Sequence, residues 1–188
     1  IVWTNIKVAI NQALIPMILV VVLPTTILGW AISGTNNLIF LIMGIWIIAA
    51  IDMGGNALNN IFDWEIDEKN NKRLELHRLI TKKQLFLIFL LLFGSTFPFL
   101  IIGNIFLKIL ILLGYIVAIS YSAGPRFKDK VLGNYVNIAL FYGPFSLLYG
   151  YFAATADISN IVNNFWMVLF VFFVDMGFAV TKDYEDVK

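Results

Sequence analysis

Carboxylate and amide side chains recur at helical spacing along one apolar stretch of the sequence. Five of them fall within about an 80° arc of one helix face, at about 100° per residue: Asp52, Asn56, Asn59, Asp63 and Asp67. Asp63 and Asp67 can reach one site, with the amide oxygen of Asn59 beside them. Such donors suit Mg²⁺, which proteins hold through carboxylates together with substrate phosphates. The alternative is that both carboxylates pair with loop lysines at the membrane interface.

A second polar cluster lies near the end of the sequence. Residues 182–188 read KDYEDVK, and Asp183 and Asp186 share one helix face because they are three residues apart. Asp175 lies on roughly the same face, about two to three turns earlier. Taken alone, this segment is typical of a solvated helix end. Together, two facing carboxylate pairs would form a site for Mg²⁺ and a diphosphate.

The elements that must position these side chains are membrane helices. Of the 188 residues, 60% are hydrophobic and only 13% are charged, whereas soluble domains carry about 25% charged residues. This composition excludes a soluble globular protein and a disordered one, and the net charge of +1 argues against a nucleic-acid partner. The sequence has no cysteine and a single histidine, which excludes thiolate and multi-histidine metal sites. We interpret that residue, His77, as a solvated loop side chain rather than a general base.

Six stretches are apolar and close to the length of about 20 residues that a spanning helix needs. They are residues 8–33, 38–62, 84–103, 105–122, 131–154 and 165–181. With the N-terminus inside, all 13 Lys and Arg residues except Lys108 lie on or near the cytoplasmic side, which is a strong positive-inside signal. We therefore expect an all-α, multi-pass integral protein of the cell membrane, with both polar clusters facing the cytoplasm.

Three motifs carry a resemblance to one enzyme family. Residues 59–67, NNIFDWEID, resemble the NDxxDxxxD motif of the UbiA superfamily of intramembrane prenyltransferases. Residues 182–188 resemble the start of that family's KDxxDxxGD motif. Residues 121–128, followed by Gly133 and Asn134, resemble its YSxPPxxxK…GN stretch. The three motifs stand in the family's order, at matching helix ends, and together cover nearly the whole sequence.

The resemblance implies a bundle of nine membrane helices around a central lipid-lined cavity, of which this sequence holds six. Residues 1–188 would be a single domain that is incomplete at its C-terminal end, because the last Asp of the second motif would fall beyond residue 188. The implied activity is Mg²⁺-dependent transfer of a prenyl group from a prenyl diphosphate to an acceptor.

The resemblance also suggests roles for individual residues. The aspartates of both motifs are expected to act in catalysis: Asp63, Asp67, Asp183 and Asp186. Together with Asn59 they are expected to bind the metal. Contacts with the substrates are expected from the neighbouring amides and basic residues: Asn56, Asn59, Arg73, Arg78, Lys128, Asn134 and Lys182. The sequence departs from the family at Asn60, where Asp is commonest, and in residues 70–81, which lack the usual prolines. Of the two arginines there we prefer Arg78 as the diphosphate ligand, because RLIT can stand in for RPxPS.

The sequence leaves the acceptor open. The second and third motifs resemble digeranylgeranylglyceryl phosphate synthases and chlorophyll synthases, and a quinone precursor is a further candidate. We favour geranylgeranyl transfer to geranylgeranylglyceryl phosphate in ether-lipid synthesis. Two other classes fit less well. The CDP-alcohol phosphotransferase motif is absent, and a cation transporter would carry carboxylates near mid-bilayer, where only Asp52 and Asp175 lie.

Overall fold

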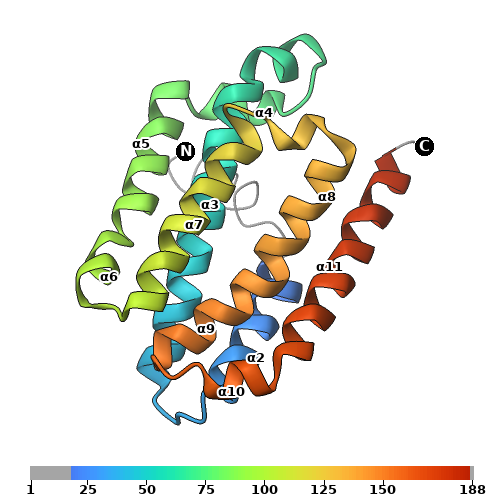
Figure 1. Cartoon of the computed structure of the whole chain (residues 1–188). Coiled ribbons are helices and arrows are strands. Elements are labelled where there is room, and N and C mark those ends of the chain that lie inside the picture. The colour runs from blue at the N-terminus through green and yellow to red at the C-terminus, as the bar shows by residue number, and fades with distance from the viewer. Residues whose placement is uncertain (1–17, 187–188) are drawn as a thin grey trace.

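A computed structural model describes the backbone of residues 18–186, and the side chains of these residues except 18, 19, 75 and 182–186. This part of the chain is all-helical, as predicted, and Figure 1 shows its helices packed side by side as a bundle. The elements are η1 (Ile18–Val22), α2 (Leu23–Ile32), α3 (Leu38–Lys69), α4 (Leu74–Leu79), α5 (Lys82–Gly94), α6 (Phe97–Ile102), α7 (Ile105–Ser122), η2 (Phe127–Asp129), α8 (Val131–Leu140), η3 (Phe141–Phe145), α9 (Ser146–Ala154), α10 (Ser159–Asn163) and α11 (Phe165–Asp186).

The membrane-spanning helices lie where the sequence predicts them. Within the described residues, four helical stretches are long and apolar enough to cross a membrane: Leu38–Lys69, Lys82–Ile102, Ile105–Ser122 and Val131–Ala154. The described parts of the first and sixth predicted spans are also apolar helices, Val20–Ile32 and Phe165–Thr181. Large apolar side chains such as Ile101 and Phe173 are well exposed on the outside of the bundle. Such an exterior suits a lipid environment, so the chain is an integral membrane protein.

Local sequence signals explain where the spans break and bend. Thr81 and Gln84 form a capping box that starts α5. The third predicted span is interrupted by a turn at Ser95 and Thr96, after which the chain continues as α6. Pro98 lies in the first turn of α6. Proline has no backbone N–H, but in the first turn of a helix that group would have no hydrogen-bond partner within the helix. Pro144 instead lies within the π-helical turn η3, which keeps α8 and α9 in one continuous stretch.

The centre of the bundle is α9, which packs against both α2 and α3. Glycine makes this approach close: a Cβ on Gly150 would lie 2.0 Å from the carbonyl oxygen of Thr26, and one on Gly29 would lie 1.8 Å from that of Leu147. Small residues let membrane helices bring their backbones together in this way. Tyr149 is fully buried and donates to the carbonyl of Leu110 at 2.8 Å.

The second span is longer than predicted and carries the first polar cluster to one end of the bundle. α3 has 32 residues, which at about 1.5 Å per residue gives about 48 Å, whereas the hydrocarbon core of a bilayer is about 30 Å thick. The predicted span ended at residue 62, whereas the helix continues to Lys69. Its last turns therefore extend beyond the hydrocarbon core. Its end lies close to α4 and to the loop between α7 and α8, and α11 runs toward this same end of the bundle (Figure 1).

Candidate active site

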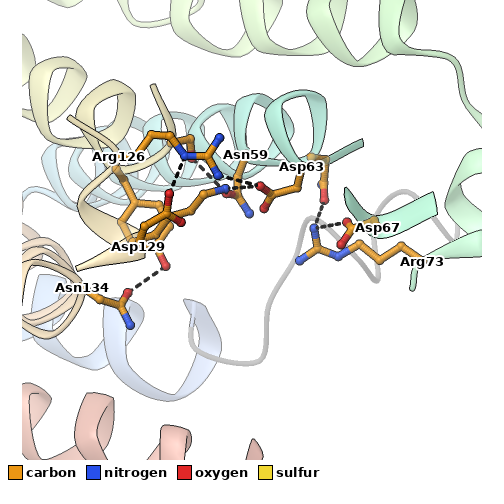
Figure 2. A network of polar contacts seen from close by, with 11 residues as sticks. Asn59, Asp63, Asp67, Arg73, Arg126, Asp129 and Asn134 are labelled. Carbon is orange, nitrogen blue, oxygen red and sulfur yellow. Dashed lines mark hydrogen bonds and ion pairs between the residues drawn. The ribbon is translucent and has the colours of Figure 1, made fainter. Parts of the chain in front are cut away.

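The C-terminal half of α3 directs an amide and a carboxylate toward the loop between α7 and α8. Asn59 Oδ1 accepts hydrogen bonds from Ser122 Oγ at 3.0 Å and from Lys128 Nζ at 2.6 Å. Lys128 Nζ also forms an ion pair with Asp63 (Figure 2). The Lys128 side chain is only 11% exposed and that of Asp63 19%. The ammonium group is thus enclosed between Asn59 and Asp63, two of the residues predicted to bind the metal.

Arg126 adds a second positive charge to Asp63. Its Nη2 lies 3.5 Å from Asp63 Oδ1, while its Nε donates to Asp129 Oδ2 at 2.6 Å. Arg126 adopts a left-handed backbone conformation, with φ of 48°, and this turns the short loop back toward α3. The hydrogen bond and charge of Arg126 lower the pKa of Asp129 below its usual value, and the hydrogen bond to Asp129 raises that of Arg126.

A separate arginine contacts the end of α3 from the loop that follows this helix. Arg73 Nη1 donates to Asn60 Oδ1 at 2.5 Å and to Asp67 Oδ2 at 3.1 Å. Asn71 and Arg73 both have positive φ, of 54° and 52°, so the chain reverses sharply after α3 and folds back along it. Figure 2 shows Arg73 beside Asp67, and Arg126 further along the same helix, near Asn59 and Asp63.

The two arginines of the loop after α3 lie in different surroundings, and one expectation for this loop needs correction. Arg78, which we preferred as the diphosphate ligand, is exposed, and among the described residues it forms no ion pair with Asp63 or Asp67; its binding of a diphosphate stays a prediction. Arg73 pairs with Asp67 because the reversal of the chain comes early in the loop. His77 is not a solvated side chain: its ring stacks on Trp64 with centroids 3.9 Å apart, and both ring nitrogens are buried.

A cavity of about 180 Å³ lies beside the polar face of α3. Its wall includes polar residues from α3, the loop after it, α7 and the stretch that contains η3: Asp52, Asn56, Asn59, Arg73, Tyr121, Asn137 and Tyr142. Buried Ala179 contributes from α11. The predicted substrate ligand Asn134 is not in this wall, but its Oδ1 accepts from the Tyr121 hydroxyl at 3.0 Å.

The second polar cluster cannot be compared with its prediction atom by atom. The side chains of Lys182, Asp183 and Asp186 lie outside the described residues, although the backbone of α11 is helical as far as Asp186. Position 183 follows Ala179 one helical turn later, on the helix that forms part of the cavity wall.

The chemistry of the first cluster fits a hard cation. Asn59 supplies an amide oxygen, and Asp63 and Asp67 each supply a carboxylate, which are the donors that Mg²⁺ takes in proteins. Among the described side chains, His, Cys, Asp and Glu do not assemble into a group of three or more that could hold a metal. Both carboxylates are instead paired with basic residues of the loops. This agrees with the alternative interpretation, in which Asp63 and Asp67 pair with loop lysines, except that the partner of Asp67 is an arginine.

Sequence reasoning missed three contributors to the site. Arg126 lies two residues before Lys128 and was part of the motif, so the same electrostatic argument could have found it. Ser122 and Asn60 are harder to predict as site residues, because a hydroxyl or an amide near a motif can form hydrogen bonds in many structural settings. Their roles depend on contacts across 63 and 13 residues of sequence, respectively.

Comparisons with known proteins agree with the motifs. The profile of the UbiA prenyltransferase family matches residues 18–188. A digeranylgeranylglyceryl phosphate synthase of Sulfurisphaera tokodaii is 29% identical over 156 residues, covering 79% of this chain and 52% of that protein. One from Methanococcus maripaludis is 28% identical over 160 residues, covering 81% and 51%. The chain therefore spans about half the length of these relatives. No solved structure matches it significantly.

Proposed function

Since the chain belongs to the UbiA prenyltransferase family, we propose that the protein transfers a geranylgeranyl group from its diphosphate to geranylgeranylglyceryl phosphate within the membrane. The observation that carries this proposal is the convergence of Lys128 and Arg126 on Asn59 and Asp63. Such a mixture of cations and oxygen donors suits a metal-bound diphosphate, whose negative oxygens need both. The names of the two relatives support the choice of acceptor.

The basic residues have a direct role in the chemistry that we propose. When the bond between the prenyl group and the diphosphate breaks, negative charge builds up on the diphosphate oxygens. In the complex with the donor, Lys128, Arg126 and Arg73 stabilise this charge, because cations placed where negative charge develops lower the barrier. Arg73 can bind two phosphate oxygens at once through its planar guanidinium, whereas Lys128 acts as a compact point charge.

We propose Mg²⁺ as the cofactor, held by Asn59, Asp63 and Asp67 together with Asp183 and Asp186. When bound, Mg²⁺ would neutralise diphosphate charge and help the diphosphate to leave. Asp63 and Asp67 are both paired with basic residues in the structure. We therefore infer that these basic residues shift from the carboxylates to the phosphates when donor and metal bind.

The position of the site fits a lipid substrate. The cavity lies between membrane helices and combines polar residues with apolar ones such as Phe141 and Ile138. A long isoprenoid chain could then remain in the bilayer while its diphosphate reaches the polar end of α3. The positive-inside distribution of Lys and Arg supports a cytoplasmic site in the cell membrane. Lys182 and Asn134 remain proposed substrate contacts.

The test uses membranes that contain the protein from the complete gene. They are incubated with labelled geranylgeranyl diphosphate, Mg²⁺ and one of three acceptors: geranylgeranylglyceryl phosphate, a chlorophyllide or an aromatic quinone precursor. Products are identified by mass spectrometry. We expect a Mg²⁺-dependent product with the first acceptor. A product with one of the other two acceptors would support prenyl transfer and correct the proposed acceptor. The absence of a product with all three acceptors would contradict the proposal.

Two variants of α3 provide the controls. Asp63→Ala removes a carboxylate of the site and should abolish the product. Glu65→Ala removes a carboxylate from the same helix whose side chain is 78% exposed and pairs with Lys82 at 3.2 Å. It should leave the activity within about twofold, because exposed ion pairs contribute little. Equal losses in both variants would point to general damage to the helix.

A further inference from the structure

Two buried polar atoms beside the cavity have no partner within the described part of the chain. They are Asp52 Oδ2 and Asn56 Nδ2, from residues one helical turn apart on α3. Asp52 is only 7% exposed, and both residues line the cavity. A buried polar atom without a hydrogen bond is costly, so an unpaired acceptor and an unpaired donor at one cavity favour the binding of a polar group there.

Asp52 is held in place by one neighbour. The hydroxyl of Tyr142, which lies in η3, donates to Asp52 Oδ1 at 3.2 Å. This bond fixes the carboxyl group and leaves its second oxygen for a ligand. Tyr121 and Arg73 are the other titratable residues in the same wall, and buried Asp175 packs against the η3 segment from α11. Tyr142 is thus a positioning residue, and Asp52 is the group that faces a ligand.

The two unpaired atoms are complementary to a hydroxyl group. A hydroxyl donates one hydrogen bond and accepts others, so it can donate to Asp52 Oδ2 and accept from Asn56 Nδ2. Residues at i and i+4 have Cβ atoms about 5–6 Å apart, which leaves room for one oxygen at hydrogen-bonding distance from both side chains. A carboxylate or phosphate would fit poorly, because a buried anion would face the carboxylate of Asp52.

We propose that Asp52 and Asn56 bind the nucleophilic hydroxyl of the acceptor and that Asp52 takes up its proton. This inference rests on the proposed prenyl transfer and adds the residue that activates the acceptor. The acceptor O–H bond breaks and its proton passes to Asp52 Oδ2. The freed oxygen forms a bond to C1 of the prenyl group, and the bond from C1 to the diphosphate breaks with its electron pair leaving on the diphosphate.

The position along α3 supports this arrangement. Asp52 precedes Asn59 by seven residues, which is about 10 Å along the helix axis. Asn59 belongs to the diphosphate end of the site, so the hydroxyl site lies deeper in the membrane on the same polar face. The reacting carbon of the donor can then lie between the leaving diphosphate and the bound hydroxyl, as a displacement requires.

The test compares isosteric variants of the full-length protein in membranes. Asp52→Asn retains the shape of the side chain but cannot accept the proton, so turnover should fall about 100-fold or more while Mg²⁺-dependent binding of labelled donor stays within about twofold. Asn56→Leu removes the donor and should raise the acceptor KM about tenfold. The matched control is Asp175→Asn, which changes another buried carboxyl group outside the cavity wall, one whose Oδ2 has no partner among the described residues, and it should retain turnover.

A second measurement does not depend on how the variants fold. The wild-type protein should bind the hydroxyl acceptor about tenfold more tightly than a deoxy analogue, because the analogue leaves both polar atoms unpaired. Normal turnover in Asp52→Asn, or equal affinity for the two acceptors, would overturn the hydroxyl site even with prenyl transfer intact. Absence of any product from the wild-type protein would refute the proposed function itself.

Discussion

Replacing Lys128 with methionine should change metal binding and donor binding in opposite directions. The substitution keeps most of the apolar stem and removes the ammonium group that contacts Asn59 Oδ1 at 2.6 Å and pairs with Asp63. In the ligand-free protein Lys128 competes with a metal ion for these oxygens. In the complex that we propose, the same ammonium group binds the diphosphate.

The size of both effects follows from the burial of the pair. Lys128 is 11% exposed and Asp63 is 19% exposed, so the contact is only partly screened by water. A hydrogen bond to a charged group contributes about 1.5–3 kcal/mol, which corresponds to roughly 10- to 150-fold in affinity. Arg126 still lies 3.5 Å from Asp63 after the substitution, which favours the lower end of this range. We therefore expect Mg²⁺ alone to bind about tenfold more tightly and the donor with Mg²⁺ about tenfold less tightly.

The assay measures the two ligands separately on purified protein in lipid nanodiscs. Binding of the metal alone is followed by calorimetry with Mg²⁺ or by the electron spin resonance of Mn²⁺, and donor binding by retention of labelled geranylgeranyl diphosphate. Lys82→Met is the matched control, because Lys82 is 42% exposed and pairs with Glu65 on the surface. Weaker binding of both ligands to Lys128→Met would refute the competition between lysine and metal and leave Lys128 with a structural role.

Three further predictions test the loops and the packing. Arg73→Ala should weaken donor binding about tenfold, whereas Arg78→Ala should leave it unchanged in the same assay; the reverse order would contradict the structure of this loop. Gly150→Ala should lower the free energy of unfolding in micelles by about 3 kcal/mol, because its Cβ would lie 2.0 Å from a backbone oxygen of α2. Gly177→Ala should be neutral or stabilising, because its Cβ would meet no described atom within 4 Å beyond the adjacent backbone of its own helix. In ¹³C NMR the carboxyl group of Asp129 should show a pKa below the ordinary value of 3.8. Because this pKa is lower in the folded state than in the unfolded state, the ionised carboxyl group stabilises the fold at pH values above 3.8. This stabilisation is lost as the pH falls through the folded-state pKa.

The helices and their order were accessible from local sequence. Runs of apolar residues near bilayer length marked the spans, because every backbone polar group inside a membrane must be paired within a helix. Helical spacing also brought Asn59, Asp63 and Asp67 onto one face without any knowledge of the fold. The apolar span predicted to end at residue 62 is only part of α3, because the charged residues after 62 continue the helix beyond the hydrocarbon core.

The partners of these side chains were much less accessible. Arg73 and Arg78 are equally basic, and the sequence does not say which of them contacts Asp67. The choice depends on the left-handed conformations of Asn71 and Arg73, which set where the chain turns back. The sequence similarly predicted a solvated loop side chain for His77. In the structure its ring stacks on Trp64 and both ring nitrogens are buried.

The sequence by itself therefore determined a multi-pass helical protein with a polar face on its second span and basic loops at the same membrane surface. Hydrophobic periodicity is a property of a single helix, and the distribution of charged loops is a property of the two membrane surfaces. Both can therefore be recognised from residues that are near one another in the sequence. Only the tertiary structure decided that Lys128 and Arg126 meet Asp63, that Arg73 meets Asp67, and that Asp52 and Asn56 line one cavity with Tyr142. These contacts join residues up to 90 positions apart, and they depend on loop conformation and helix packing.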